Sequence, residues 1–206
     1  MIREGHLSRL RCHVGWGFRS SCAEEKCQQF IDEHKTEGVR ITKKVKVGSA
    51  YQYITDEIKE EKTNLVILGA KGVSGIEEVF IGSLTEKMVR YADCPVLTVK
   101  SRVKLEDIKN IVLASSFSDE DSHVAEEIKK LQEVFSAKLH LVRVNTPSNF
   151  ETTRTIMSRA NTFVEKNKIK NCTITIYNDK VEEDGILFFT QDIGADLIAL
   201  ATHGHT

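Results

Sequence analysis

A single stretch, residues 64–100, constrains the fold more than any other part of the chain. It begins with the continuous apolar run Leu65-Val66-Ile67-Leu68, which is typical of a strand buried on both faces of a parallel sheet. After a glycine-rich segment, apolar residues recur at the spacing of one helix face, at Leu84, Met88 and Tyr91. Beyond Pro95, residues 96–99 form a second apolar run. This alternation predicts an α/β fold with open parallel sheets flanked by helices.

The glycines of this stretch predict an anion site between the first strand and the helix. Gly69, Gly72 and Gly82 would let backbone N–H groups approach a phosphate without interference from a Cβ atom. The first amides of the following helix would add a partial positive charge. Ser83 and Glu86 have the S-x-x-E spacing of a capping box, so a turn followed by an ordinary helix cap is the alternative interpretation.

The spacing of these residues resembles a known nucleotide-binding signature. Gly69-x2-Gly72-x9-Gly82-Ser83, continued by Cys94-Pro95-Val96, is similar to the motif of the universal stress protein family. The chain has neither the Gly-Lys-Ser/Thr of a Walker A loop nor a G-x-G-x-x-G fingerprint. The resemblance implies a Rossmann-like, adenine nucleotide alpha hydrolase-like fold that binds ATP at the carboxyl ends of its strands. The nucleotide-binding residues that it implies are Gly69, Gly72, Gly82 and Ser83.

Composition narrows the class of protein further. The 206 residues contain 30 acidic and 29 basic side chains, so no field that attracts nucleic acid is expected. No apolar run approaches the roughly 18 residues that a membrane span requires. The first twenty residues lack the apolar region of a signal peptide, and the five cysteines form no C-x-x-C pair. We therefore expect a cytoplasmic protein with reduced thiols and no membrane partner.

Helical and strand patterns alternate along the rest of the chain. Helical faces are predicted within residues 23–34, 50–58, 124–135, 156–164 and 186–193, and strands within 39–47, 108–114, 139–144, 173–177 and 197–201. A charged segment, residues 100–107, has the composition of a linker. Residues 1–19 leave two interpretations open, which are a short strand that includes Leu10, Cys12 and Val14, or a disordered leader.

Two internal matches predict a tandem repeat. Residues 23, 27, 30 and 31 match residues 156, 160, 163 and 164 at an offset of 133, and residues 65, 66, 68 and 72 match residues 197, 198, 200 and 204 at an offset of 132. We expect a first universal-stress-type domain at 20–100 without its N-terminal strand and helix. We expect a second at 106–206 without its C-terminal loop, helix and strand, and a leader of uncertain structure at 1–19.

The order of strands in the resembled family, 3-2-1-4-5, has a consequence for both domains. The first domain would lack its central strand, so its remaining strands would be neighbours only after rearrangement or by borrowing a strand. The second would lack only an edge strand, so its sheet is expected to stay contiguous. The edges left unpaired favour self-association, and a homo-oligomer is predicted.

Other candidate sites are weaker. The resembled family has an Asp at the end of its first strand, and Ser116 stands at that position in the second domain, which argues against nucleotide binding there. His203-x-His205 lacks a nearby Cys or carboxylate, so no metal site is predicted. Lys71 is expected to be a solvated loop residue, and Cys94 a packing residue. Lys43, Lys44 and Lys46 would face solvent from an edge strand.

The function predicted from these observations is that of a universal stress protein-like regulatory protein that binds adenine nucleotide in a stress response. The alternative is a nucleotide-free interaction module that acts as a scaffold through dimer-like pairing of its domains. No Ser-His-Asp or Cys-His arrangement can be assembled, so no catalytic residue and no enzyme is predicted. Weak ATP hydrolysis is left open.

Overall fold

The computed structural model describes residues 8–12, 20–35, 37–69, 82–101 and 103–201, with side chains from Glu24 onward. The chain divides into two compact units, Met1–Thr98 and Val99–Thr206. Strands and helices alternate in both, and the strand registers given for the described residues are parallel. The predicted α/β class, with parallel sheets flanked by helices, is confirmed.

The second unit is built on one contiguous four-stranded sheet of order β7-β6-β5-β8. The central strand β5 pairs with β6 in the register Val112↔His140 and with β8 in the register Val112↔Ile198. The prediction that this sheet stays contiguous is confirmed. Its strands are β5 (Asn110–Ala114), β6 (Lys138–Asn145), β7 (Cys172–Asn178) and β8 (Leu197–Leu200).

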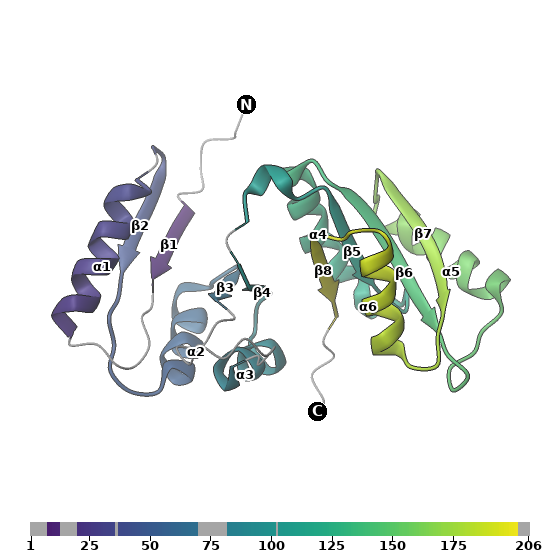
Figure 1. Ribbon diagram of the computed structural model, residues 1–206, viewed down its shortest axis with the longest axis horizontal. Coiled ribbons are helices and arrows are strands. Elements are labelled where there is room, and N and C mark those ends of the chain that lie inside the picture. The colour runs from purple at the N-terminus through teal and green to yellow at the C-terminus, as the bar shows by residue number, and fades with distance from the viewer. Residues whose placement is uncertain (1–7, 13–19, 36, 70–81, 102, 202–206) are drawn as a thin grey trace. The chain divides into compact units, whose positions relative to one another are not determined.

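Helices cover both faces of that sheet, as Figure 1 shows. On one face, the buried residues Leu113 and Leu139 pack with α4 (Ser122–Phe135) and α5 (Thr153–Lys166). On the other face, Val112 and Val142 pack with α6 (Glu182–Asp192). Two short 3-10 turns, η1 (Leu105–Asp107) and η2 (Asp119–Asp121), precede β5 and α4. Residues 111–114 of β5 are buried, because their unbroken apolar run suits a strand covered on both faces.

The first unit has two separate pairs of strands among its described residues. In one pair, β1 (Ser8–Cys12) runs parallel to β2 (Val39–Lys43), with α1 (Ser20–Glu33) between them in the chain. In the other, β3 (Val66–Gly69) lies beside β4 (Val96–Val99). Two further helices, α2 (Ala50–Glu61) and α3 (Ser83–Tyr91), complete the unit. A single open sheet in the first unit is therefore not what the structure shows. Of the two interpretations left open for residues 1–19, the structure shows a strand at Ser8–Cys12.

One face of β3 is covered and the other is exposed. Val66 is buried in a cluster with Ile54, Ile58 and Met88, which come from α2 and α3. Ile67, whose side chain points to the opposite face, is 53% exposed. The prediction that residues 65–68 are buried on both faces is thus wrong for one face, because no helix of the described residues packs against it.

Two smaller predictions also need correction. The predicted strand of residues 39–47 ends at Lys43, and Val47 lies outside it, exposed. Lys44 instead forms an ion pair with Glu57 of α2, which draws this segment toward the helix. On α3, Met88 is fully buried, as predicted, but Tyr91 is 60% exposed.

Candidate functional site

The predicted phosphate-binding residues lie at the end of β3 and the start of α3. Gly69 is the last residue of β3, Gly82 is the N-cap of α3, and Ser83 is its first helical residue. Met88 and Leu84 of α3 pack with Val66 and Leu68 of β3, so the helix lies against the strand that precedes it in the chain. Gly72, like Lys71, lies outside the described residues. Three of the four predicted residues thus lie where they were expected, at the end of a strand or at the start of the following helix.

The predicted capping box is not formed. Ser83 lies one residue inside the helix, and the N-cap, Gly82, has no side chain with which to accept a hydrogen bond. The backbone N–H of Glu86 donates to the carbonyl of Gly82 at 3.1 Å, and its carboxylate pairs with Arg90 at 3.5 Å rather than reaching back. The first amides of α3 precede the start of the helical hydrogen-bond ladder, so they need acceptors from outside the helix.

Neither glycine of this site is required by the backbone geometry that the structure shows. Gly82 has φ −58° and ψ 147°, which any L residue can adopt. A Cβ atom added at Gly82 or at Gly69 would meet no heavy atom of the described residues within 4 Å. The space beside both residues is therefore open as far as the described residues are concerned, and a side chain at either position would displace none of them.

In the second unit, a buried carboxylate closes the end of β5. Asp121, only 1% exposed, accepts hydrogen bonds from the hydroxyls of Ser115 and Ser116 at 2.7 and 2.9 Å. It also accepts one from the backbone N–H of Ser116 at 3.0 Å. The next residue, Phe117, has φ 61°, and its N–H donates to the Ser115 hydroxyl at 2.8 Å. Ser116 is thus engaged within the protein.

Arg159 ties the same loop to α5. Its Nε donates to the carbonyl of Ser116 at 2.8 Å, and its two terminal nitrogens donate to the Glu151 carboxylate at 2.8 and 2.7 Å. These hydrogen bonds hold the pKa of the Glu151 carboxyl below its ordinary value and raise the pKa of Arg159. Asp121 and Arg159 were not singled out from the sequence, because their partners come together only in the folded chain.

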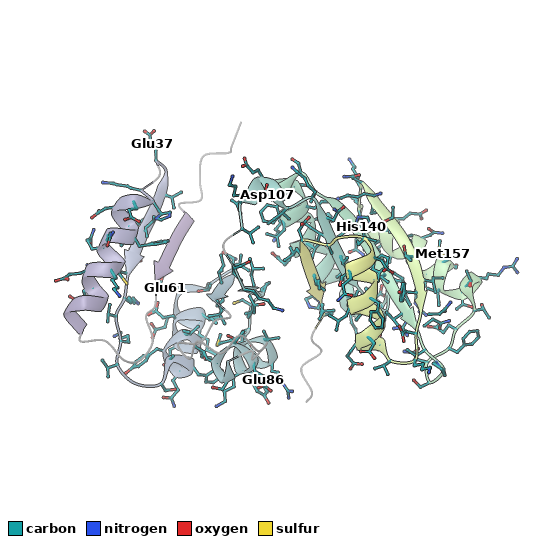
Figure 2. The ribbon with its side chains drawn as sticks, in the orientation of Figure 1. Glu37, Glu61, Glu86, Asp107, His140 and Met157 are labelled. Carbon is teal, nitrogen blue, oxygen red and sulfur yellow. The ribbon has the colours of Figure 1, made fainter. Side chains whose placement is uncertain are left out.

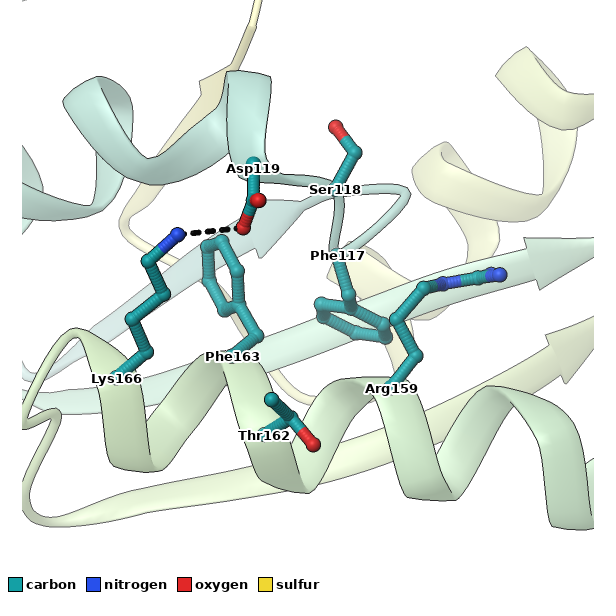
Figure 3. Close-up of a pocket in the computed structure, with 7 residues that line it drawn as sticks. All are labelled: Phe117, Ser118, Asp119, Arg159, Thr162, Phe163 and Lys166. Atoms are coloured by element: carbon teal, nitrogen blue, oxygen red, sulfur yellow. Dashed lines mark hydrogen bonds and ion pairs between the residues drawn. The ribbon is translucent and has the colours of Figure 1, made fainter.

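A cavity of about 300 Å³ opens between this loop and α5, as Figure 3 shows. The phenyl rings of Phe117 and Phe163 form its apolar part, with centroids 5.8 Å apart. Lys166 at its border is paired with Asp119 at 2.6 Å, and Arg159 is paired with Glu151. Since both basic side chains that line it already have carboxylate partners, the cavity has little capacity to bind an anion.

The remaining candidates have structural roles. Cys94 packs against the cluster of Ile54, Ile58 and Met88, and burial, followed by the charge of Asp93, raises the pKa of its thiol. A packing role, rather than a reactive thiol, agrees with these contacts. Lys46 lies 5.7 Å from the ring centroid of Tyr53. His203 and His205 lie outside the described residues. Within the described ranges, no group of three or more His, Cys, Asp or Glu side chains could hold a metal ion.

Comparison with known proteins finds similarity to universal stress proteins. Residues 18–100 match the model of the universal stress protein family. The universal stress protein Sll1388 of Synechocystis is 35% identical over 78 residues, which cover 38% of this chain and 51% of that protein. The universal stress protein MJ0531 of Methanocaldococcus jannaschii is 29% identical over 99 residues, which cover 46% and 58%. The chain thus spans about half the length of the curated relatives that it matches.

A solved structure supports the fold over a longer range. A universal stress protein from Archaeoglobus fulgidus superposes with a TM-score of 0.72 at 16% identity, covering 95% of this chain and 76% of that one. At this identity the likeness concerns the fold alone. Within the described residues, no helix is long and apolar enough to cross a membrane. Residues 18–100 of this chain are thus similar to the universal stress protein family, and so are the relatives that match it.

Proposed function

We propose that this chain is an adenine-nucleotide-binding regulatory protein of the stress response, and that its first unit binds ATP. The observation that carries the proposal is the open space at Gly69 and Gly82, beside the N-terminus of α3. Backbone amides and the helix dipole would attract a phosphate there, and no Cβ atom would obstruct it. The motif falls inside the segment that matches the family.

Titration calorimetry with ATP on the full chain tests this proposal. Gly82→Val should weaken binding at least about tenfold, because its side chain would enter the space assigned to the phosphate, while φ −58° suits valine. Tyr91→Val is the matched control, since Tyr91 is exposed at the far end of the same helix, about 12 Å along its axis. Unchanged affinity in Gly82→Val would contradict the assignment.

A second variant locates the site within the chain. The hydroxyl and N–H of Ser116 both donate to Asp121, so they are occupied without a ligand. Ser116→Ala should therefore leave ATP affinity unchanged if binding resides in the first unit. A loss of affinity in this variant would transfer the site to the second unit.

A nucleotide-free scaffold is the second candidate function. It is favoured by the separation of β1–β2 from β3–β4, because a nucleotide site in this fold lies at the ends of adjacent strands. The two functions differ in what the purified protein carries. Denaturing the protein and analysing the supernatant by chromatography and ultraviolet absorbance should reveal bound adenine nucleotide. Stoichiometric nucleotide favours the first function, and its absence, together with no heat from added ATP, favours the scaffold.

The finer properties of the protein are proposed on the same basis. We expect a cytoplasmic binding protein rather than an enzyme, with no nucleic-acid partner, because its charges nearly cancel. Phosphate release from ATP at no more than the rate without protein would agree with this. Self-association is expected through exposed apolar side chains such as Ile198 and Leu200 of β8. Light scattering over a dilution series should show a mass that falls on dilution, whereas a monomer at every concentration would contradict it.

A further inference from the structure

In the second unit, β5 lies between β6 and β8. β5 forms backbone hydrogen bonds with β6 on one edge and β8 on the other, and its central residues Ile111, Val112 and Leu113 are fully buried. α4, which follows β5 in the chain, covers the face of β8 that carries Leu197 and Ala199. A strand and the helix after it thus complete both the sheet and one of its faces.

Among its described residues, the first unit has strands that correspond to β6, β7 and β8 but none that corresponds to β5. Ser8 of β1 corresponds to Leu141 of β6 at the offset of 133 found between the two halves of the sequence. β1 pairs in parallel with β2 as β6 pairs with β7, although the register differs by two residues at this offset, since Ser8 lies opposite Val39 and Leu141 lies opposite Ile174. At the offset of 132, β3 corresponds to β8. Yet among the described residues β1 pairs only with β2 and β3 only with β4, so nothing described there takes the position of β5.

The free side of β3 has the features of a site for such a segment. The N–H of Val66 donates to Pro95 at 3.0 Å, on the β4 edge. Because backbone groups alternate between the edges of a strand, the N–H and C=O of Ile67 lie on the opposite edge, which pairs with no strand of the described residues. The exposed side chains of Leu65 and Ile67 lie on the face that corresponds to Leu197 and Ala199, which α4 covers in the second unit.

We propose that the first unit binds a segment of a partner polypeptide that consists of an apolar strand followed by an amphipathic helix. The strand would run parallel to β3 along its free edge, with apolar side chains on both faces. The helix would cover Leu65 and Ile67. Strand addition of this kind draws affinity from main-chain hydrogen bonds and specificity from the side chains. The inference does not depend on nucleotide binding.

A synthetic peptide of residues 108–136 of this chain, which contains β5 and α4, is the probe, because these elements fill the equivalent position in the second unit. Fluorescence anisotropy of the labelled peptide should show saturable binding to the full chain. Hydrogen exchange should slow in residues 66–69 when the peptide is added. The same peptide with Leu113→Lys should bind at least tenfold more weakly.

Two variants of the protein separate strand addition from other binding. Ile67→Glu places a charge on the proposed face, and Ile67→Pro removes the N–H on the free edge, which a strand edge tolerates. Both should weaken binding at least tenfold, whereas Val47→Glu, at another exposed position of the same unit, should not. Circular dichroism checks that each variant is folded. Absence of binding, or binding that both Ile67 variants leave unchanged, overturns the proposal. So does protection of the Ile67 N–H before the peptide is added, since a segment of the same chain would then fill the position.

Discussion

β3 and β8 are corresponding strands, but opposite faces of them are covered. In β3, Val66 and Leu68 pack beneath α2 and α3, and Ile67 is exposed. In β8, Ala199 packs beneath α4, and Ile198, which corresponds to Val66, is 42% exposed. Both strands are apolar throughout, so the burial of a residue depends on which helix lies over it and not on the strand's own sequence.

The largest expected effect is on stability, and it concerns the helices that pack against β3. Met88→Ala should lower the free energy of unfolding by about 2–5 kcal/mol, because it leaves a cavity against Val66, Ile54 and Ile58. Tyr91→Ala, on the exposed side of the same helix, should change it by no more than about 0.5 kcal/mol. Urea denaturation, monitored by a probe in the first unit, measures the free energy of unfolding of both variants. Equal effects would mean that α3 does not cover β3 as described.

Hydrogen exchange tests the difference between the two units directly. Amides of β5 and β6 lie within a four-stranded sheet, whereas β2 belongs to a two-stranded one. Residues 110–114 and 138–144 should therefore exchange at least about tenfold more slowly than residues 39–43. Mass spectrometry of peptic fragments resolves these segments. Equal protection would show that the first unit's strands are as well supported as those of the second.

These comparisons also show what could be predicted from the sequence. The order of strands and helices could, because apolar periodicity is a local property, and the buried faces of α2 and α5 followed from it. The exposure of Ile67 could not be predicted, because it depends on which helix packs over β3, and the sequence of β3 alone does not indicate this. At the site, Gly69 and Gly82 lie where the motif placed them, but the N-cap fell one residue before Ser83. Arg159 binds Ser116 across 43 positions, and such a contact leaves no local signal.

A smaller effect is expected at the start of the two corresponding strands. Asp196, just before β8, accepts hydrogen bonds from the N–H groups of Lys109 and Asn110 at 2.8 and 2.9 Å. Asn64 holds the corresponding position before β3. Asp196→Ala should cost about 1 kcal/mol of stability, because exposed charge-assisted bonds are partly replaced by water. Asn64→Ala should cost less, and this matched pair can be compared by thermal or urea unfolding. A larger loss in Asn64→Ala would mean that it, too, binds a neighbouring strand.

The smallest effect concerns a polar row that crosses the sheet of the second unit at His140, labelled in Figure 2. Its Nε2 lies 3.2 Å from Asn110 Oδ1, and its Nδ1 lies 3.0 Å from the Thr173 hydroxyl. An Nε2–H that donates to Asn110, with Nδ1 accepting from Thr173, satisfies both contacts in the neutral ring. Burial, and then the charge of Lys138, lower the pKa of His140 below its ordinary value of 6.5.

The direction of the resulting pH dependence follows from this lowered pKa. Below pH 6.5 the unfolded chain binds a proton that the folded chain resists, so unfolding is favoured as the pH falls. The contribution of His140 to stability is thus complete above pH 6.5 and is lost as the pH falls through the lowered pKa of the folded state. Urea midpoints of the second unit, measured between pH 8 and pH 5.5, should fall less in His140→Gln than in the unchanged chain. Glutamine keeps a polar side chain at this position but does not titrate, so equal slopes for the two proteins would show that His140 titrates alike in the folded and unfolded states.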